Sequence, residues 1–214
     1  MRVQTVLITT AVGVASSAAL AGPVNLLSNA GFESQVNFDG NNVGNWAAFF
    51  GGADFQMSES IVPVDPPVDG LQVLQTGTFN TPNTFVGVVQ SVSIQEGMEY
   101  EFSLFAREIV QNGIFAEFRI EWLDSGGVFI GDQFALNMSI TDALVTDWTQ
   151  FSVSGLAPSG AVTANAVFAV QTFGSADPYE GFVQVDGTSF HKVPAPGTLA
   201  LLAVGAIAAP RRRR

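Results

Sequence analysis

The stretch Glu99-Tyr100-Glu101-Phe102-Ser103-Leu104-Phe105-Ala106 has an apolar residue at every even-numbered position. Successive side chains of a β-strand point to opposite faces of the sheet, so these four residues share one face. The stretch is therefore predicted to be a strand with that face buried in a core.

Similar alternation recurs across residues 22–192, interrupted by turn signals such as Asp69-Gly70 and Asn112-Gly113. No convincing helical stripe of apolar residues occurs outside the two ends of the chain. Many short strands with regular turns predict an all-β fold, a jelly-roll β-sandwich, for this region. The predicted strands are 56–62, 71–76, 85–94, 99–106, 114–123, 129–138, 149–153, 164–172 and 182–190.

Composition excludes several classes of protein. The chain is 47% hydrophobic and 13% charged, which excludes intrinsic disorder. It has no cysteine and one histidine, so disulfides, thiol catalysis and cysteine metal sites are excluded. All 19 acidic residues but only three of the eight basic ones lie within residues 22–192, which gives that region a charge of 3 − 19 = −16. Such acidity argues against nucleic acid as a partner.

The N-terminus has the three parts of a secretory signal peptide. Arg2 supplies a positive charge, Val3 to Leu20 is uncharged, and Ala19-Leu20-Ala21 is a small-residue cleavage pattern. Residues 1–21 are therefore predicted to be a signal helix cleaved after Ala21, and the protein is predicted to be exported. A buried N-terminal helix is the alternative.

The C-terminus differs from the central region. Val193-Pro194-Ala195-Pro196-Gly197 is expected to end the last strand, because proline cannot complete a sheet ladder. An uncharged run, Thr198 to Ala209, leads to Pro210 and Arg211-Arg212-Arg213-Arg214. A spanning helix needs about 20 residues, so this short apolar helix reaches that length only marginally, with its arginines snorkelling to the cytoplasmic side. Residues 193–214 are predicted to be a separate tail.

This order of proline motif, apolar helix and arginine cluster resembles the PEP-CTERM tail of Gram-negative-type bacteria. In that family an exosortase recognises the motif and removes the tail. The resemblance implies an exosortase-like partner, transient contact with the membrane, and delivery to the cell envelope, cell surface or extracellular matrix. Pro194-Ala195-Pro196 stands where the family has Pro-Glu-Pro. A plain C-terminal anchor is the alternative.

The central region resembles carbohydrate-binding modules of the family 4/9, galactose-binding-like type. The matching segments are Asn25 to Glu33 near its start, Gln90 to Arg107 in the middle and Val183 to Phe190 at its end. The resemblance implies a jelly roll and a polysaccharide partner.

The same resemblance implies a structural calcium ion that ties the first strand to the last. Glu33 and Asp186 stand at the matching positions, and Asp69 and Gly70 lie in the loop that adds a carbonyl oxygen in the family. Calcium takes six to eight oxygen ligands, which suits this set. The alternative is two exposed carboxylates that merely lie near each other.

Sugar binding needs exposed aromatic faces beside planar polar groups. Trp148 shares its strand face with Gln150, and Tyr179 lies in an expected loop, so these three are the predicted ligand-binding residues. Tyr100 and Trp122 fall on apolar faces and are expected in the core.

Three other groups are interpreted without a ligand. The segment Phe49-Phe50-Gly51-Gly52 is interpreted as a loop at the edge of the core. Glu117, Arg119 and Glu121 alternate along one strand and are interpreted as a surface charge ladder. His191 is interpreted as a solvated strand end rather than a general base.

No recognisable catalytic motif is present, so the first hypothesis is a non-catalytic, exported protein that binds or sits among polysaccharide. A small glycan hydrolase or lyase on the same scaffold is the second, and a structural matrix protein without a specific ligand is the third. A cleft with two convergent carboxylates would favour the enzyme, whereas an aromatic-lined face would favour binding.

Overall fold

The computed structural model describes residues 22–35, 45–130, 138–139, 144–174, 177 and 179–194. The predicted signal helix (1–21) and the apolar helix and arginines of the tail lie outside the described residues. Within the described part of the chain, no helix is long and apolar enough to cross a membrane.

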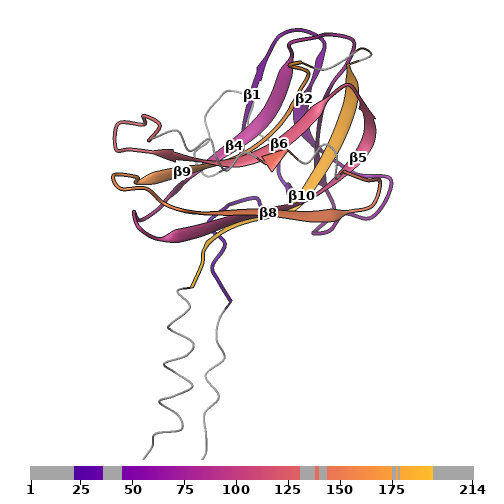
Figure 1. Cartoon of the computed structure of the whole chain (residues 1–214). Helices are drawn as coiled ribbons and strands as arrows, with labels where there is room; N and C mark the ends of the chain where they lie inside the picture. Colours follow the sequence, from indigo (N-terminus) through magenta and orange to yellow (C-terminus); the bar gives the residue numbers. More distant parts are fainter. Residues whose placement is uncertain are drawn as a thin grey trace, which may run out of the picture.

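Two five-stranded antiparallel sheets pack face to face (Figure 1), which confirms the predicted jelly-roll sandwich. In sheet A the strands lie in the order β1 (Ala47–Gly51), β4 (Phe85–Ser93), β9 (Thr163–Gln171), β6 (Phe115–Leu123) and β7 (Met138–Ser139). In sheet B the order is β2 (Phe55–Ile61), β3 (Val73–Thr78), β10 (Glu180–Lys192), β5 (Glu99–Asn112) and β8 (Thr149–Leu156).

The core forms where the apolar faces of the two sheets meet. As the alternation predicts, Tyr100, Phe102, Leu104 and Ala106 of β5 are all buried. Phe102 meets Phe118 of sheet A edge to face, with ring centroids 5.6 Å apart. Burial of such side chains is the main favourable term in folding, and it is achieved without a disulfide.

Two of the strand predictions need correction. Strand β1 was not predicted, because Ala47-Ala48-Phe49-Phe50 does not alternate and two glycines follow it. In place of a strand over 129–138 the structure has a single bridge between Phe129 and Leu123 and the two-residue β7. Most of the residues between them lie outside the described ones.

The two described ends of the chain are held together. The Leu26 N–H donates to the Phe190 carbonyl at 2.8 Å, and the Asn25 side chain bonds the backbone of Thr188 and Phe190. β10 ends at Lys192, directly before the proline motif, and is two residues longer at each end than the predicted strand 182–190. The segment 25–33 thereby lies beside β10 and reaches the loop that joins β2 to β3.

Candidate functional site

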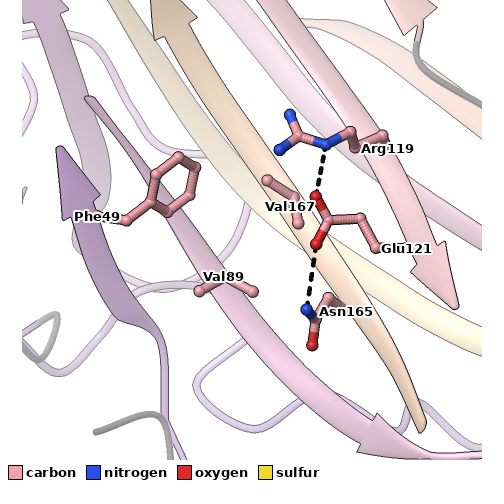
Figure 2. A pocket seen from close by; sticks show the side chains of 6 residues that line it. All are labelled: Phe49, Val89, Arg119, Glu121, Asn165 and Val167. Atoms are coloured by element: carbon pink, nitrogen blue, oxygen red, sulfur yellow. Dashed lines mark hydrogen bonds and ion pairs between the residues drawn. The ribbon is translucent and has the colours of Figure 1, made fainter. Parts of the chain in front are cut away.

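A hollow of about 200 Å³ lies on the outer face of sheet A (Figure 2). Four neighbouring strands contribute to it, because every second residue of β1, β4, β9 and β6 points away from the core. The side chains that line it are Phe49, Val89, Arg119, Glu121, Asn165 and Val167.

One wall of the hollow is a connected row of polar side chains. Arg119 pairs with Glu117 through Nη1 at 2.6 Å and with Glu121 through Nε at 2.8 Å. Amide groups of β9 complete the row: Asn165 Nδ2 donates to Glu121 at 3.1 Å, and Gln171 Nε2 donates to Glu117 at 3.3 Å. The three charged side chains are 8–16% exposed. The predicted charge ladder exists, but it is largely buried rather than on the open surface, because its members cover one another and β9 amides flank them.

The opposite wall is apolar, and sequence reasoning missed it. Phe49 belongs to β1 and faces the hollow (Figure 2), so its assignment to a loop at the core edge is corrected. Its ring lies 6.2 Å from that of Phe85, which in turn lies 5.9 Å from Phe173. Phe173 is 44% exposed, so the aromatic row continues from the hollow to the surface. The pairing of Ala47 with Val89 sets the face on which Phe49 lies, and only the sheet register reveals it.

Such a hollow suits a ligand with both apolar and polar faces. The flat ring of Phe49 and the methyl groups of Val89 and Val167 can pack on C–H groups. The guanidinium, carboxylate and amide groups opposite can exchange hydrogen bonds with hydroxyls. Both carboxylates already accept hydrogen bonds from Arg119.

Trp148, a predicted sugar-binding residue, directly precedes β8 in the chain. It therefore belongs to sheet B, whereas the hollow lies on sheet A. The Arg107 guanidinium carbon stands 4.6 Å from the centroid of the Trp148 ring, a cation–π contact. The indole Nε1 donates to the Pro66 carbonyl at 3.1 Å. The Trp148 side chain is therefore half-buried and committed to the loop that precedes β3, while Gln150 is exposed two residues further on.

Tyr179, the third predicted residue, is not brought together with Trp148. It lies half-buried directly before β10, with a backbone φ of 55°. The adjacent end of β10 pairs with Asn112 of β5, whereas the end of β8 next to Trp148 pairs with Ala106. Six residues of strand separate these positions, about 20 Å. The three predicted residues do not form one site, and none of them lines the hollow.

Asp186, a predicted calcium ligand, is fully buried in β10. Its Oδ2 accepts hydrogen bonds from the N–H groups of Val68 at 2.7 Å and Asp69 at 2.8 Å, and its Oδ1 from Gly187 at 2.7 Å. Burial raises the pKa of the Asp186 carboxyl group above its ordinary value of 3.8, against the opposing effect of the three N–H donors. The nearby Asp69 carboxylate raises the pKa further.

Glu33 binds the same loop. Its Oε1 accepts the N–H groups of Leu71 at 2.8 Å and Gln72 at 2.9 Å. The carboxylate lies against Gly70, whose φ of +68° suits glycine and where a Cβ would collide with it. The structure therefore brings the three predicted calcium residues to one loop. Among the described residues, however, no group of three or more His, Cys, Asp or Glu side chains is arranged to hold a metal ion.

His191 is the penultimate residue of β10, on the sheet opposite the hollow. Its Nδ1 lies 3.3 Å from Ser189 Oγ, and its Nε2 lies 3.9 Å from Glu101. The imidazole therefore sits near a strand end, as predicted, but its side chain is 16% exposed rather than solvated, and it is not part of the hollow.

The sequence matches no protein-family model and no curated protein. Solved structures do share the fold. The enzymatically active domain of tailspike protein 4 from bacteriophage CBA120 is 16% identical with a TM-score of 0.57. That match covers 79% of this chain but 21% of the tailspike chain, so this chain spans about a fifth of its length.

Two carbohydrate-binding modules match over almost their whole length. The xylan-binding domain CBM22-1 of Xyn10C from Paenibacillus barcinonensis is 18% identical with a TM-score of 0.51, and the match covers 83% of this chain and 99% of that one. TmCBM61, solved with β-1,4-galactotriose, is 11% identical with a TM-score of 0.51 and coverage of 79% and 99%. The described region thus has the jelly-roll fold of carbohydrate-binding modules, as the resemblance implied.

Burial of Asp186 predicts that the free energy of unfolding depends on pH and that the Asp186→Asn substitution removes this dependence. Because the folded state raises the pKa of this carboxyl group, it holds the proton more tightly than the unfolded state does, and ionisation destabilises the fold. The quantity to compare is the free energy of unfolding of the wild type minus that of Asp186→Asn, measured in a chelating buffer. This difference should be largest below pH 3.8 and should decrease as the pH rises. Urea unfolding at pH 3 to 7 measures the difference, and an increase with pH would contradict the assignment.

Proposed function

We propose that this protein is a non-catalytic carbohydrate-binding protein and that the glycan binds in the hollow of sheet A. The observation that carries the proposal is the pairing of an apolar wall around Phe49 with the hydrogen-bonded row around Arg119. A pyranose ring presents the matching surfaces, C–H faces and a rim of hydroxyls. Two solved structures of the same fold, a xylan-binding domain and a module bound to galactotriose, support this choice.

The charge of the protein indicates which glycans it accepts. The region 22–192 carries 19 acidic and three basic residues, and Glu117 and Glu121 flank the single arginine of the hollow. Acidic polysaccharides are repelled by such a field. The preferred ligand is therefore a neutral polysaccharide.

A glycan-active enzyme is the alternative function. The tailspike domain, described as enzymatically active, shares the fold, and two carboxylates line or adjoin the hollow. Glycoside hydrolysis needs one carboxyl group as an acid and a second as a base or nucleophile on either side of the bond. Here both carboxylates are ion-paired with the same Arg119, which supports binding over catalysis. A structural matrix protein without a ligand is the third possibility.

Replacement of Phe49 tests the position of the glycan site. Phe49→Ala should weaken binding of a neutral β-linked polysaccharide by roughly tenfold or more, since an aromatic contact contributes about 0.5–1.5 kcal/mol beyond its buried area. Phe50→Ala is the matched control: Phe50 is the next residue on β1, faces away from the hollow and is 44% exposed. Affinity electrophoresis against a panel of neutral and acidic polysaccharides gives the measurement.

Two results would count against this site. Equal weakening by both variants would show that the hollow is not the contact. Loss of binding in Trp148→Phe or Gln150→Ala, with Phe49→Ala unaffected, would return the site to the residues predicted from the sequence.

A further result would favour the enzyme instead of a binding protein. This result is hydrolysis of any polysaccharide in the panel by the wild type, with loss of that activity in Glu121→Gln.

We also propose that calcium binds between Glu33 and Asp186. The Glu33 and Asp186 carboxylates bind the backbone of the same loop before β3, and the Asp69 carboxylate raises the pKa of Asp186 by like-charge repulsion. A cation at this point would offset that repulsion. Loop and segment carbonyls would supply the other oxygens that calcium needs.

Chelation should then destabilise the protein. Calcium at a hundredfold excess over its dissociation constant stabilises the folded state by roughly 2.7 kcal/mol. EDTA should lower the melting temperature of the wild type, and Asp186→Ala should be insensitive to it. Asp124→Ala, which changes a carboxylate in a different turn, is the control and should keep the response. An unchanged wild-type melting curve in EDTA would refute the calcium site.

Export and sorting complete the proposed function. We infer from residues 1–21 and 193–214 that an export system and an exosortase-like enzyme deliver the protein to the cell surface or matrix. The Val193 N–H donates to the Glu99 carbonyl at 2.8 Å, so contact with the sheet extends to the first residue of the proline motif.

Removal of residues 193–214 tests the tail. Because β10 ends at Lys192, the shortened protein should unfold cooperatively at nearly the wild-type temperature. In its host it should appear in the periplasm or medium rather than at the surface. Loss of cooperative unfolding would mean that the tail is part of the fold, and unchanged surface display would mean that it is not the sorting signal.

A further inference from the structure

Within the described part of the chain, one edge of strand β8 has no neighbouring strand. It is the outermost strand of sheet B and pairs with β5 at all eight residues, from Thr149 with Ala106 to Leu156 with Glu99, without a register shift. The other side of its backbone has N–H and C=O groups that point away from the sheet. No described residue bonds to that side. Such an edge is a template for another strand.

The other outer strands are shorter or irregular. β1 has five residues and β7 two. β2 has a register shift between Gln56 and Glu59, a bulge-type irregularity that blunts an edge. By contrast, β8 contains no proline, no charged residue and no irregularity. It lacks the devices by which natural edges avoid pairing.

The charge distribution indicates what pairs with β8. No charged residue occurs from Trp148 to Ala176, although the chain has 19 acidic residues. Two copies of so acidic a protein repel each other at most approaches. A contact through β8 would bring no carboxylate of one copy opposite a carboxylate of the other.

We propose that two copies of this protein pair through β8, antiparallel, about a two-fold axis at Ser152. Sheet B then continues as one ten-stranded sheet through both copies. On the outer face, Ser152 lies opposite Ser152 of the partner subunit, and Gln150 opposite Ser154 of the partner subunit. On the core side, half-buried Phe151 lies opposite Val153 of the partner subunit, an aromatic–β-branched pair of the kind that stabilises sheets.

The side chains of β8 suit this arrangement. Gln150, Ser152 and Ser154 are exposed and uncharged, so their pairing buries no unpaired charge. An eight-residue edge is smaller than a standard protein interface, so the dimer is expected to form and dissociate readily with concentration. The hollow of sheet A stays open, and the proposal does not depend on what that hollow binds.

A single cysteine tests the pairing directly, because the chain has none of its own. In the full chain, Ser152→Cys places the new thiol opposite its copy, at a Cβ separation of about 4.5–5.5 Å, which a small strand movement brings to the roughly 3.5–4.5 Å of a disulfide. Mild oxidation should give a disulfide-linked dimer on non-reducing gels. Ser93→Cys is the matched control, because Ser93 is an exposed strand serine on internal strand β4, and it should cross-link at least tenfold more slowly.

A lysine substitution at the edge of β8 provides the second part of the experiment. Ser154→Lys adds a charge beside the axis, so in the Ser152→Cys chain it should lower the cross-linking rate at least tenfold, whereas Ser93→Lys should not. Unchanged thermal unfolding verifies that each variant is folded. The proposal is overturned if Ser152→Cys cross-links no faster than Ser93→Cys, if Ser154→Lys has no effect, or if β8 is found occupied by a strand of another protein.

Discussion

The contact between β5 and β6 holds the two sheets together. Phe102 meets Phe118 edge to face, and the Tyr100 ring lies against that of Trp122 with centroids 6.2 Å apart. Because a strand has two faces, burying these rings commits Tyr100, Phe102, Leu104 and Ala106 of β5 to the core and turns the residues between them outward. Each sheet therefore has one outer face that the core does not use, and these two faces differ in chemistry.

The outer face of sheet B is largely used for holding a loop. Arg107 donates two hydrogen bonds to Gln184 and forms an ion pair with Asp65 of the loop. Trp148 donates to the Pro66 carbonyl, and Asp186 accepts from the Val68 N–H. These anchors come from three different strand regions and fix a segment that prolines already stiffen. The polar and aromatic groups that make sheet B look like a binding face are therefore occupied. Sheet A has no such covering loop among the described residues, and its polar row lines an open hollow.

Local periodicity explains which features the sequence could predict. The alternation in Glu99 to Ala106 and its counterparts predicted the buried face of each strand, because a two-residue period depends on neighbours along the chain. The hollow depends instead on the order β1-β4-β9-β6, which joins residues more than 100 positions apart, from Phe49 to Asn165. Trp148 was correctly placed on an outward face, but its partner Arg107 comes from another strand and could not be predicted from local sequence. Phe49 was missed because the glycines after it indicated a loop.

An excess of negative charge constrains every interaction of this protein. Residues 22–192 contain three basic side chains. Arg107 and Arg119 are already paired with carboxylates, and Lys192 lies at the exposed end of β10. Most carboxylates thus have no basic partner, and repulsion among them acts on any approaching anion or second copy. Each of the three proposed partners would avoid or reduce this repulsion: a cation between Glu33 and Asp186, a neutral glycan beside Arg119, and the uncharged β8 of a second copy. The same electrostatic constraint therefore favours the proposed metal, the proposed ligand and the proposed dimer, although each proposal rests on its own contacts.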